Sequence, residues 1–441
     1  MPDWYRAPSR RGSGSDLFLG VDVGSSSTKI VVVDGGRGAE VAGASEAGPF
    51  VTVGGRTEAT VDDLLGVVRR ALGRLDGALL GRVAGVGIAG MAESGAPLDA
   101  DGRALAPVIA WHDRRGEAVA ERLTASFGPA LDGAVGQRLR YVATVAKLGW
   151  LVENELAGAA PARWLGVAEL VLRALTGAEA TEWSLAARTG CFDVGRREWL
   201  PDVARAAGFG VEVFPPVSAA GEVMGRVTAE GSAWSGLAVG VPVTVAGHDH
   251  LVGFVGSGAG ADDLVDSVGT AETVVGRSEW CPDARQGLAV GLFPGGDGWA
   301  VSSSAARAGR AVDAAAAALG LPPAALDAMA TGARVLDAPG LLSSLRRREP
   351  PALPGGDPAD VWVTLLDALA SETAAAVDRV TAALGPRRRL VVFGGGSVSV
   401  PLLAAKARRI PISVERAPTV DAAARGAARF AAVAAGYHAN W

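Results

Sequence analysis

Three features of the 441-residue sequence predict an α/β fold with two domains. Apolar runs typical of strands alternate with stretches of helical spacing along the whole chain. The length exceeds the roughly 100–200 residues of an ordinary single domain. A similar strand–turn–strand pattern occurs twice, near residues 20 and 265. We therefore expect domains at residues 16–244 and 245–441, preceded by a flexible leader at residues 1–15.

The predicted strands and helices alternate along the chain. Residues 17–33 predict two strands joined by a turn of small residues at Gly24–Ser27. The rest of the first half predicts a helix at 62–79, a strand at 83–89, and helices at 117–123, 145–156 and 167–175. The second half predicts a strand at 241–246, a hairpin at 264–275, a helix at 358–384, a strand at 389–393 and a helix at 420–435.

The composition disfavours nucleic acids and membranes as binding partners. A net charge of -5 gives no basic surface for nucleic acid, and no uncharged apolar run approaches the roughly 20 residues that span a membrane. Cys191 and Cys281 are too few for a disulfide framework or a zinc cluster. The first 15 residues lack the apolar segment of a signal peptide. We expect a cytoplasmic protein whose partner is a small molecule or a second copy of the chain.

Lysine is rare in this arginine-rich chain. The three lysines are Lys29, Lys147 and Lys406. We attribute the preference for arginine over lysine to the compositional bias of the source genome. A lysine that is buried or faces a site in such a background is nevertheless a candidate for a specific role.

The first turn of small residues could hold a phosphate. Glycine and serine in Gly24–Lys29 allow the backbone to approach a ligand, and their N–H and O–H groups can donate to phosphate oxygens. Asp22, at the end of the strand before this turn, could hold Mg²⁺ through water. The alternative is an ordinary hairpin turn.

A carboxylate between two histidines follows the strand at 241–246. Asp249, flanked by His248 and His250, could accept the proton of an attacking hydroxyl. The alternatives are a helix N-cap and a metal site. We expect no metal here, because three adjacent residues should not direct their side chains to one face.

Two further glycine turns lie in the second half. Gly269 and Thr270 follow Asp266 and could form a second phosphate-contacting turn. Gly394, Gly395 and Gly396 with Ser397 follow a strand, and bare backbone there would allow a flat adenine to lie against it.

A third group of residues suits a polyhydroxylated ligand. Glu93 and Ser94 follow the strand at 83–89, and Trp111, Asp113 and Arg115 come shortly after. Carboxylate and guanidinium groups can bond hydroxyls, and an indole can stack on the C–H face of a sugar. A salt-bridge network at the strand end is the alternative.

Two other nucleotide motifs are disfavoured. No Gly-Lys dipeptide occurs, so the sequence lacks a P-loop. Gly85–Gly90 formally matches the dinucleotide fingerprint, but the turn-rich segment 94–102 follows it in place of a helix. A nicotinamide-dependent oxidoreductase is therefore a weak alternative.

Together and in this order, the motifs resemble the FGGY carbohydrate kinases. The resemblance runs from about residue 17 to the segment 421–427 near the C-terminus. That family shares the fold of actin, hexokinase and the Hsp70 ATPase domain. The resemblance thus implies two actin-like (ribonuclease H-like) domains with a ligand cleft between them, and ATP-dependent phosphorylation of a small sugar or polyol.

The resemblance also implies roles for individual residues. Asp249 would be the catalytic base, and Asp22 would hold Mg²⁺. The substrate would contact Glu93, Ser94, Trp111, Asp113, Arg115 and His248. ATP and its phosphates would contact Gly24, Ser25, Ser26, Thr28, Lys29, Gly269, Thr270, Gly394, Gly395, Gly396 and Ser397. ATP and Mg²⁺ are the expected cofactors, no nucleic acid or membrane partner is expected, and a homodimer is compatible with the sequence.

The chain departs from the family pattern in ways that leave the sugar open. It is shorter than most members, which implies trimmed loops in the C-terminal half. Xylulokinases usually have Met-His-Gly where this chain has Met91-Ala92-Glu93, and glycerol kinases have Arg-Glu at the last two of these positions. A ketose or an alditol is expected as the substrate. The alternative is a catalytically silent sugar- or nucleotide-binding protein on the same fold.

Overall fold

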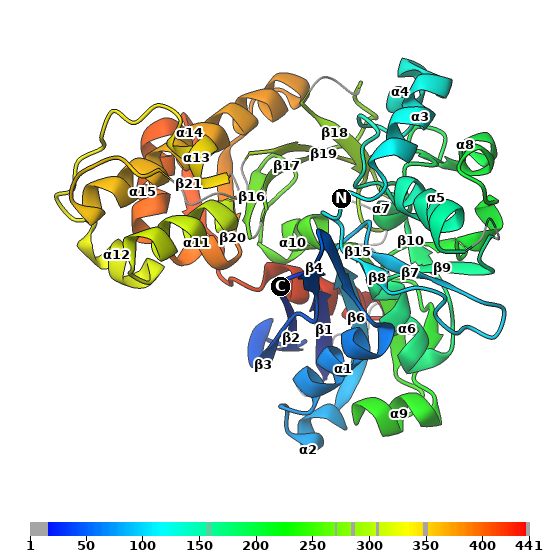
Figure 1. Ribbon diagram of the computed structural model, residues 1–441. Coiled ribbons are helices and arrows are strands. Elements are labelled where there is room, and N and C mark those ends of the chain that lie inside the picture. The colour runs from blue at the N-terminus through cyan, green and yellow to red at the C-terminus, as the bar shows by residue number, and fades with distance from the viewer. Residues whose placement is uncertain are drawn as a thin grey trace. The chain divides into compact units, whose positions relative to one another are not determined.

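The computed structural model describes residues 16–156, 158, 160–269, 271–283, 287–305, 308–346 and 352–437. The leader predicted for residues 1–15 and the phosphate contact predicted for Thr270 lie outside these ranges. Strands and helices alternate along the described chain, so the predicted α/β class is confirmed (Figure 1). Within this part of the chain no helix is both long and apolar enough to cross a bilayer.

The chain divides into two compact units, which are described separately. The first comprises the described residues up to Gly256, together with Glu279–Ala300 and the segment from Ala423 onward; the second comprises Ser257–Ser278 and Val301–Ala422. The sequence placed the domain boundary after residue 244, which falls inside a strand of the first unit. Asp249 and the C-terminal helix therefore belong to the first unit, although the sequence analysis placed both in the C-terminal domain.

The first unit is built on a mixed six-stranded sheet. Its strands lie in the order β14 (Gly225–Arg226), β15 (Pro242–His248), β6 (Val83–Gly90), β1 (Leu17–Val23), β2 (Ser27–Asp34) and β3 (Ala39–Ala47). The three central strands β15, β6 and β1 are parallel. Asp22 is level with Ala89, and His248 is level with Gly90. The carboxyl ends of the three parallel strands consequently meet at one edge of the sheet.

One face of this sheet packs on helices α1 (Val61–Leu72) and α6 (Val167–Thr176). Alternate residues of β1 and β2, such as Leu19 and Val32, form a buried cluster with side chains of both helices. Thr60 caps α1 by accepting a hydrogen bond from the backbone N–H of Asp63. The sequence predicted one helix over residues 62–79, but α1 ends at Leu72 and a separate short helix, α2, spans Gly77–Leu80. That prediction was wrong because Gly73 caps the first helix.

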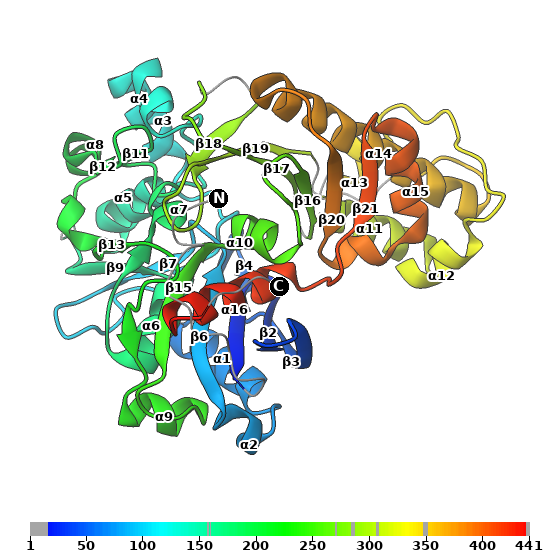
Figure 2. The same ribbon diagram turned by 180° about the vertical axis from the view of Figure 1, so that it is seen from behind.

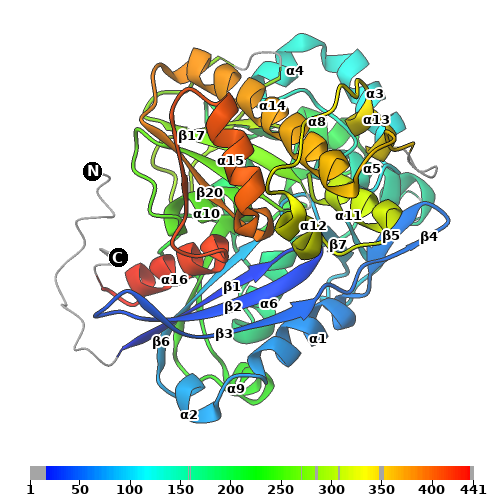
Figure 3. The ribbon, with the colours of Figure 1, turned by 90° about the vertical axis from the view of Figure 1, so that its left-hand side faces the viewer.

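The opposite face is covered by the C-terminal helix α16 (Ala422–Ala434), as Figure 3 shows. The helix backbone lies so close that a Cβ on Gly20 would be 1.8 Å from the carbonyl oxygen of Ala424. A Cβ on Gly87 would be 1.9 Å from the carbonyl oxygen of Ala427. The glycines that formally match the dinucleotide fingerprint therefore allow close packing of a helix. This packing accounts for the sequence feature that suggested an oxidoreductase.

The first unit contains further helices and small sheets. A five-stranded sheet has the order β4 (Val51–Val53), β5 (Arg56–Ala59), β8 (Val108–Ile109), β7 (Gly95–Leu98) and β9 (Arg163–Gly166). The remaining helices are α3 (Glu117–Phe127), α4 (Pro129–Ala134), α5 (Thr144–Asn154), α7 (Trp183–Ala186), α8 (Pro201–Ala206), α9 (Ala229–Ser235) and α10 (Asp249–Gly256). Short strands β10 (Thr181–Glu182), β11 (Phe192–Asp193), β12 (Glu198–Trp199) and β13 (Val217–Ser218) pair as β10 with β13 and β11 with β12.

The second unit repeats the combination of a mixed sheet and covering helices (Figure 2). Its strands follow the order β19 (Trp299–Ser304), β17 (Glu272–Ser278), β16 (Leu264–Val268), β20 (Arg389–Phe393) and β21 (Ser413–Arg416). The helices are α11 (Ala308–Leu319), α12 (Pro323–Met329), α13 (Leu341–Arg346), α14 (Pro358–Leu384) and α15 (Val400–Arg409). The predicted hairpin at 264–275, strand at 389–393 and helix at 358–384 are confirmed.

Candidate active site

The carboxyl edge of the first unit's sheet brings together residues from three strands. Asp22 is the penultimate residue of β1, Glu93 follows β6, and Asp249 follows β15 directly. In an open sheet with parallel strands, ligands bind outside this edge. Residues that are more than 200 positions apart in the sequence therefore converge where the fold favours a binding site.

Asp249 is aimed by a sharp passage from β15 into α10. Gly247 has a φ of 116°, which favours glycine, and a Cβ there would lie 2.5 Å from Ser184 Oγ. The backbone N–H of His248 donates to Ser184 Oγ over 2.9 Å. Glu182 accepts hydrogen bonds from the N–H and O–H of Ser184 and from the N–H of Gly295. These buried hydrogen bonds fix the backbone that carries Asp249.

The carboxylate of Asp249 is ionised and still reachable. Its side chain is 22% exposed. Burial by itself would raise the pKa of Asp249, but interactions with His250, including the backbone N–H at 2.6 Å from Oδ1, and with Lys29 leave that pKa below its usual range. Burial lowers the pKa of His248 to about 3, so its imidazole is neutral, with Nε2 3.3 Å from Asp249 Oδ1. The arrangement offers a hydrogen-bond acceptor to a neighbouring hydroxyl.

The two histidines and Asp249 come closer together than the sequence suggested. One ligand atom from each of His248, Asp249 and His250 lies within 4.8 Å of the others. The expectation that three adjacent side chains could not share a face was wrong, because the chain changes from strand to helix at this point.

The first turn of small residues lies beside this group. Asp22 faces Lys29 across the β1–β2 hairpin, and Lys29 helps to lower the pKa of Asp249. Thr28 is fully buried, and its Oγ1 has no hydrogen-bond partner among the described residues. Ser26 is exposed, and its carbonyl oxygen accepts from the N–H of Gly48. Hydroxyl and N–H groups of this turn are thus placed at the carboxyl edge, as a phosphate site requires.

Glu93 is held by two basic residues that the sequence analysis did not assign to the site. It has a φ of 67°, an uncommon conformation for a residue other than glycine. Arg188 forms an ion pair with the Glu93 carboxylate and also donates to Gln137 Oε1 over 2.5 Å. The ammonium group of Lys147 donates to the carbonyl oxygens of Glu93 and Trp111 over 3.0 and 2.9 Å. The rarity of lysine was the one sequence signal for Lys147, and Arg188 had none.

Asp113 and Arg115 form the salt-bridge network that the sequence left open as an alternative. The guanidinium binds both carboxylate oxygens of Asp113 over 2.9 Å and reaches Glu58 over 2.8 Å. The backbone N–H of Thr57 also donates to Asp113 over 2.7 Å. The two side chains are only 1% and 4% exposed. They have little surface to offer a substrate, and their contacts fix the loop that carries Trp111.

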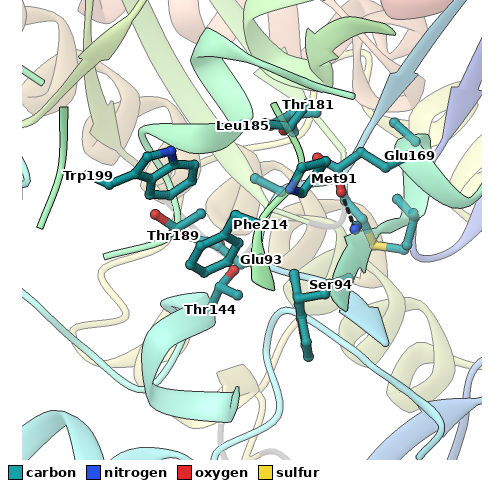
Figure 4. A pocket seen from close by; sticks show the side chains of 16 residues that line it. Met91, Glu93, Ser94, Thr144, Glu169, Thr181, Leu185, Thr189, Trp199 and Phe214 are labelled. Carbon is teal, nitrogen blue, oxygen red and sulfur yellow. Dashed lines mark hydrogen bonds between the residues drawn. The ribbon is translucent and has the colours of Figure 1, made fainter. Parts of the chain in front are cut away.

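A small pocket with a mixed polar and apolar lining lies next to Glu93 and Ser94 (Figure 4). Ser94 is buried, and its Oγ has no partner among the residues described. Burial raises the pKa of Glu169 in this pocket to about 7, although Thr181 and the N–H of Gly166 bond its carboxyl group. The pocket offers about 30 Å³ to the centres of water-sized molecules, each of which needs roughly 10–15 Å³. It has room for a few waters and is too small for a sugar.

The second unit presents two glycine turns at neighbouring strand ends. Gly269 follows β16, and Gly394–Ser397 follows β20, which pairs with β16 up to Phe393. A Cβ on Gly395 would meet no atom within 4 Å, so this part of the turn borders open space that a flat ring could fill. The hydroxyl of Ser397 donates to the carbonyl oxygen of Gly394 over 2.7 Å. The Ser397 side chain therefore stabilises the turn to which it belongs, while the glycines leave the backbone of the turn accessible.

Both units match domains of one known protein family. The N-terminal domain of the FGGY family of carbohydrate kinases matches residues 17–256, and the C-terminal domain of that family matches residues 300–435. The chain belongs to the FGGY family.

The relatives that this chain matches are named for different sugars. L-fuculokinase of Escherichia coli (strain K12) is 32% identical over 206 residues, which are 44% of this chain and 42% of that protein. Xylulose kinase of Streptomyces rubiginosus is 28% identical over 308 residues, 69% of this chain and 63% of that protein. The match to L-fuculokinase spans less than half of that protein's length.

Solved FGGY structures share the fold over almost the whole chain. Xylulose kinase from Rhodospirillum rubrum has a TM-score of 0.79 at 24% identity and covers 95% of this chain and 89% of its own. Plasmodium falciparum glycerol kinase with ADP has a TM-score of 0.80 at 17% identity, covering 95% and 90%. The predicted two-domain actin-like fold is confirmed.

Proposed function

We propose that this FGGY protein transfers a phosphoryl group from ATP to a hydroxyl of a small sugar or polyol. The observation that carries the proposal is Asp249. It is an ionised, partly exposed carboxylate at the carboxyl edge of the sheet, near enough to Lys29 for that ammonium group to help lower its pKa. A carboxylate in this position can orient a hydroxyl and accept its proton.

Asp249 acts as the base in this proposal. It accepts the proton of the substrate hydroxyl while that oxygen attacks the terminal phosphorus of ATP and ADP leaves. Phosphoryl transfer depends mainly on alignment and on stabilisation of charge. The neutral imidazole of His248 and the N–H of His250 orient the carboxylate. Lys29 and the O–H and N–H groups of Gly24–Thr28 contact the transferred phosphoryl group.

The donor set suits Mg²⁺ and ATP. Asp22 supplies the hard carboxylate oxygen that Mg²⁺ prefers, and the ion would neutralise charge on the phosphates. Gly269, Gly394, Gly395 and Gly396 of the second unit would contact the nucleotide. The open space beside Gly395 supports this assignment for the adenosine part.

The substrate class we propose is a ketose or an alditol. The Glu93 carboxylate can accept hydrogen bonds from hydroxyls, and Trp111 offers an indole face. His248 is neutral, so it can donate or accept. The names of the relatives make L-fuculose and D-xylulose the first ketoses to test. Ala92 departs from the usual xylulokinase pattern, which favours testing beyond xylulose. A cytoplasmic location and a homodimer remain part of the proposal.

The test is release of ADP, coupled to NADH oxidation, with Mg-ATP and a substrate panel. The panel contains L-fuculose, D-xylulose, other pentuloses and hexuloses, pentitols, erythritol and glycerol. We expect ADP release with one substrate well above the rate without substrate. Absence of both ADP release and ATP binding would contradict the proposal.

A catalytically silent binding protein is the second candidate. It would bind ATP or a sugar in calorimetry but release no ADP with any member of the panel. The ionised state and exposure of Asp249 favour the enzyme, because a silent protein has no need of an accessible anion beside the phosphate turn.

A further inference from the structure

The second unit contains a fully buried cluster of charges. Lys406 of α15 lies between Asp266 of β16 and Glu272 of β17, and all three side chains are 0% exposed. Lys406 Nζ donates to Glu272 Oε1 over 2.7 Å and to Asp266 Oδ2. Thr373 of α14 donates to the same Glu272 oxygen. The cluster joins two strands and two helices.

Stability alone gives no reason for this cluster. Two carboxylates share one ammonium group, and the second oxygen of each carboxylate, Asp266 Oδ1 and Glu272 Oε2, is buried without a hydrogen-bond partner among the described residues. Burying an ion pair brings little net stabilisation, and apolar side chains of similar volume often do as well. A cluster that is costly to bury and incompletely bonded is more readily explained by a requirement for geometry.

The position of the cluster indicates which geometry it controls. Asp266 and Glu272 stand on either side of the turn that contains Gly269, and β16 pairs with β17 across that turn. Lys406 belongs to the helix that follows Gly394–Ser397. The second turn also packs closely on the residue before Gly269, since a Cβ on Gly394 would be 2.6 Å from the carbonyl oxygen of Val268 at the end of β16. One lysine thus connects the supports of both glycine turns.

We propose that Lys406 is a positioning residue that holds the Gly269 turn and the Gly394–Ser397 turn in the mutual arrangement required for nucleotide binding. The proposal rests on the proposed function, in which both turns contact ATP. Lys406 itself is buried and does not touch the nucleotide. It acts through Asp266 and Glu272 at the two ends of the phosphate-contacting turn.

The test is the affinity for ADP, measured by titration calorimetry of the full chain. Lys406→Met keeps the length of the side chain and removes the ammonium group. Because Lys406→Met leaves two carboxylates without their cation, Lys406→Met/Glu272→Gln is measured beside it as a variant with less buried charge. We expect the Kd for ADP to rise at least about 10-fold in each folded variant.

A matched control lies one helical turn away. Arg409 joins α15 to α14 through an ion pair with Asp367, and its side chain is 48% exposed. Arg409→Met should leave the Kd for ADP within about 2-fold of the wild-type value. With an accepted substrate, Lys406→Met/Glu272→Gln should raise KM for ATP and leave KM for the sugar within about 2-fold.

The outcomes separate this inference from the proposed function. Wild-type ADP affinity in Lys406→Met/Glu272→Gln would overturn the positioning role while leaving the kinase proposal intact. An equal loss in Arg409→Met, or an equal rise of KM for ATP and sugar, would mean a general structural role and would also overturn it. Failure of the wild-type chain to bind ADP would overturn both.

Discussion

The two units use a similar strand–turn–strand pattern for opposite purposes. Asp22 of the first unit lies two residues before Gly24 and keeps part of its surface exposed, at the same edge of the sheet as Asp249. Asp266 of the second unit lies three residues before Gly269 and is completely buried against Lys406. Because side chains alternate between the faces of a strand, a shift of one residue relative to the turn directs the carboxylate to the other face. The first carboxylate is available to a ligand, and the second supports the backbone.

This comparison teaches that a buried carboxylate and an accessible one require different partners. The accessible Asp249 is kept ionised by its neighbours. Burial raises the pKa of Glu169 in the first unit to about 7, and it raises the pKa of Asp266 in the second unit to about 7 although Lys406 lies beside it. Burial therefore favours the protonated form of both carboxyl groups, whereas the partly exposed Asp249 stays ionised.

The largest expected effect is on catalysis at the accessible edge. Asp249→Asn keeps the shape of the side chain but removes the base, so turnover should fall at least about 100-fold. The melting temperature and the affinity for ADP should change little. The measurement is ADP release with the substrate identified in the panel.

Asp202→Asn is the matched control for this prediction. Asp202 lies on α8 with its side chain 80% exposed, and we expect wild-type turnover for this variant. Near-normal turnover in Asp249→Asn would show that Asp249 is not the base. The contrast between an accessible carboxylate in the first unit and a buried one in the second would then fail.

The next effect concerns the stability of the second unit. Lys406→Met should lower the free energy of unfolding by about 3–5 kcal/mol, because it leaves buried carboxylates without their cation. Arg409→Met breaks a half-exposed ion pair and should cost at most about 1 kcal/mol. Urea unfolding followed by circular dichroism measures both. Equal losses in the two variants would contradict the distinction between a buried and a solvated ion pair.

A smaller loss is expected where the first unit depends on close packing. Gly87→Ala would place a Cβ 1.9 Å from a backbone oxygen of α16 and should destabilise the protein by about 3 kcal/mol. Gly77→Ala meets no atom within 4 Å and should change stability by less than about 0.5 kcal/mol. The difference in melting temperature checks this pair. Similar melting temperatures would show that α16 can move away from the sheet.

The smallest effect is a pH dependence at Glu169. The folded state keeps a proton on this carboxyl group up to about pH 7, whereas the unfolded state loses it near pH 4.5. The folded state binds more protons in this window, so the contribution to stability is present at low pH and is lost as pH rises towards 7.

Glu169→Gln tests that pH dependence. Relative to the variant, wild type should lose roughly 2 kcal/mol between pH 5 and pH 8. Urea unfolding at both pH values gives the difference. A pH dependence unchanged by the substitution would mean that Glu169 is ionised throughout.

The sequence by itself determined the α/β class, the two hairpin turns, the order of the motifs and the choice of Asp249 as the candidate base. These features depend on local patterning, on turn residues and on the residue types that the chemistry requires. The rarity of lysine also drew attention to Lys29, Lys147 and Lys406 before their contacts were known.

Only the tertiary structure decided how these residues are used. It assigned α16 to the first unit, buried Asp113 and Arg115 in an ion pair, and brought Arg188 to Glu93 across 95 positions of sequence. It also showed that Gly85 and Gly87 accommodate a helix. The physical reason is that burial and ion pairing depend on neighbours from distant segments, and local sequence carries no record of which segments will meet.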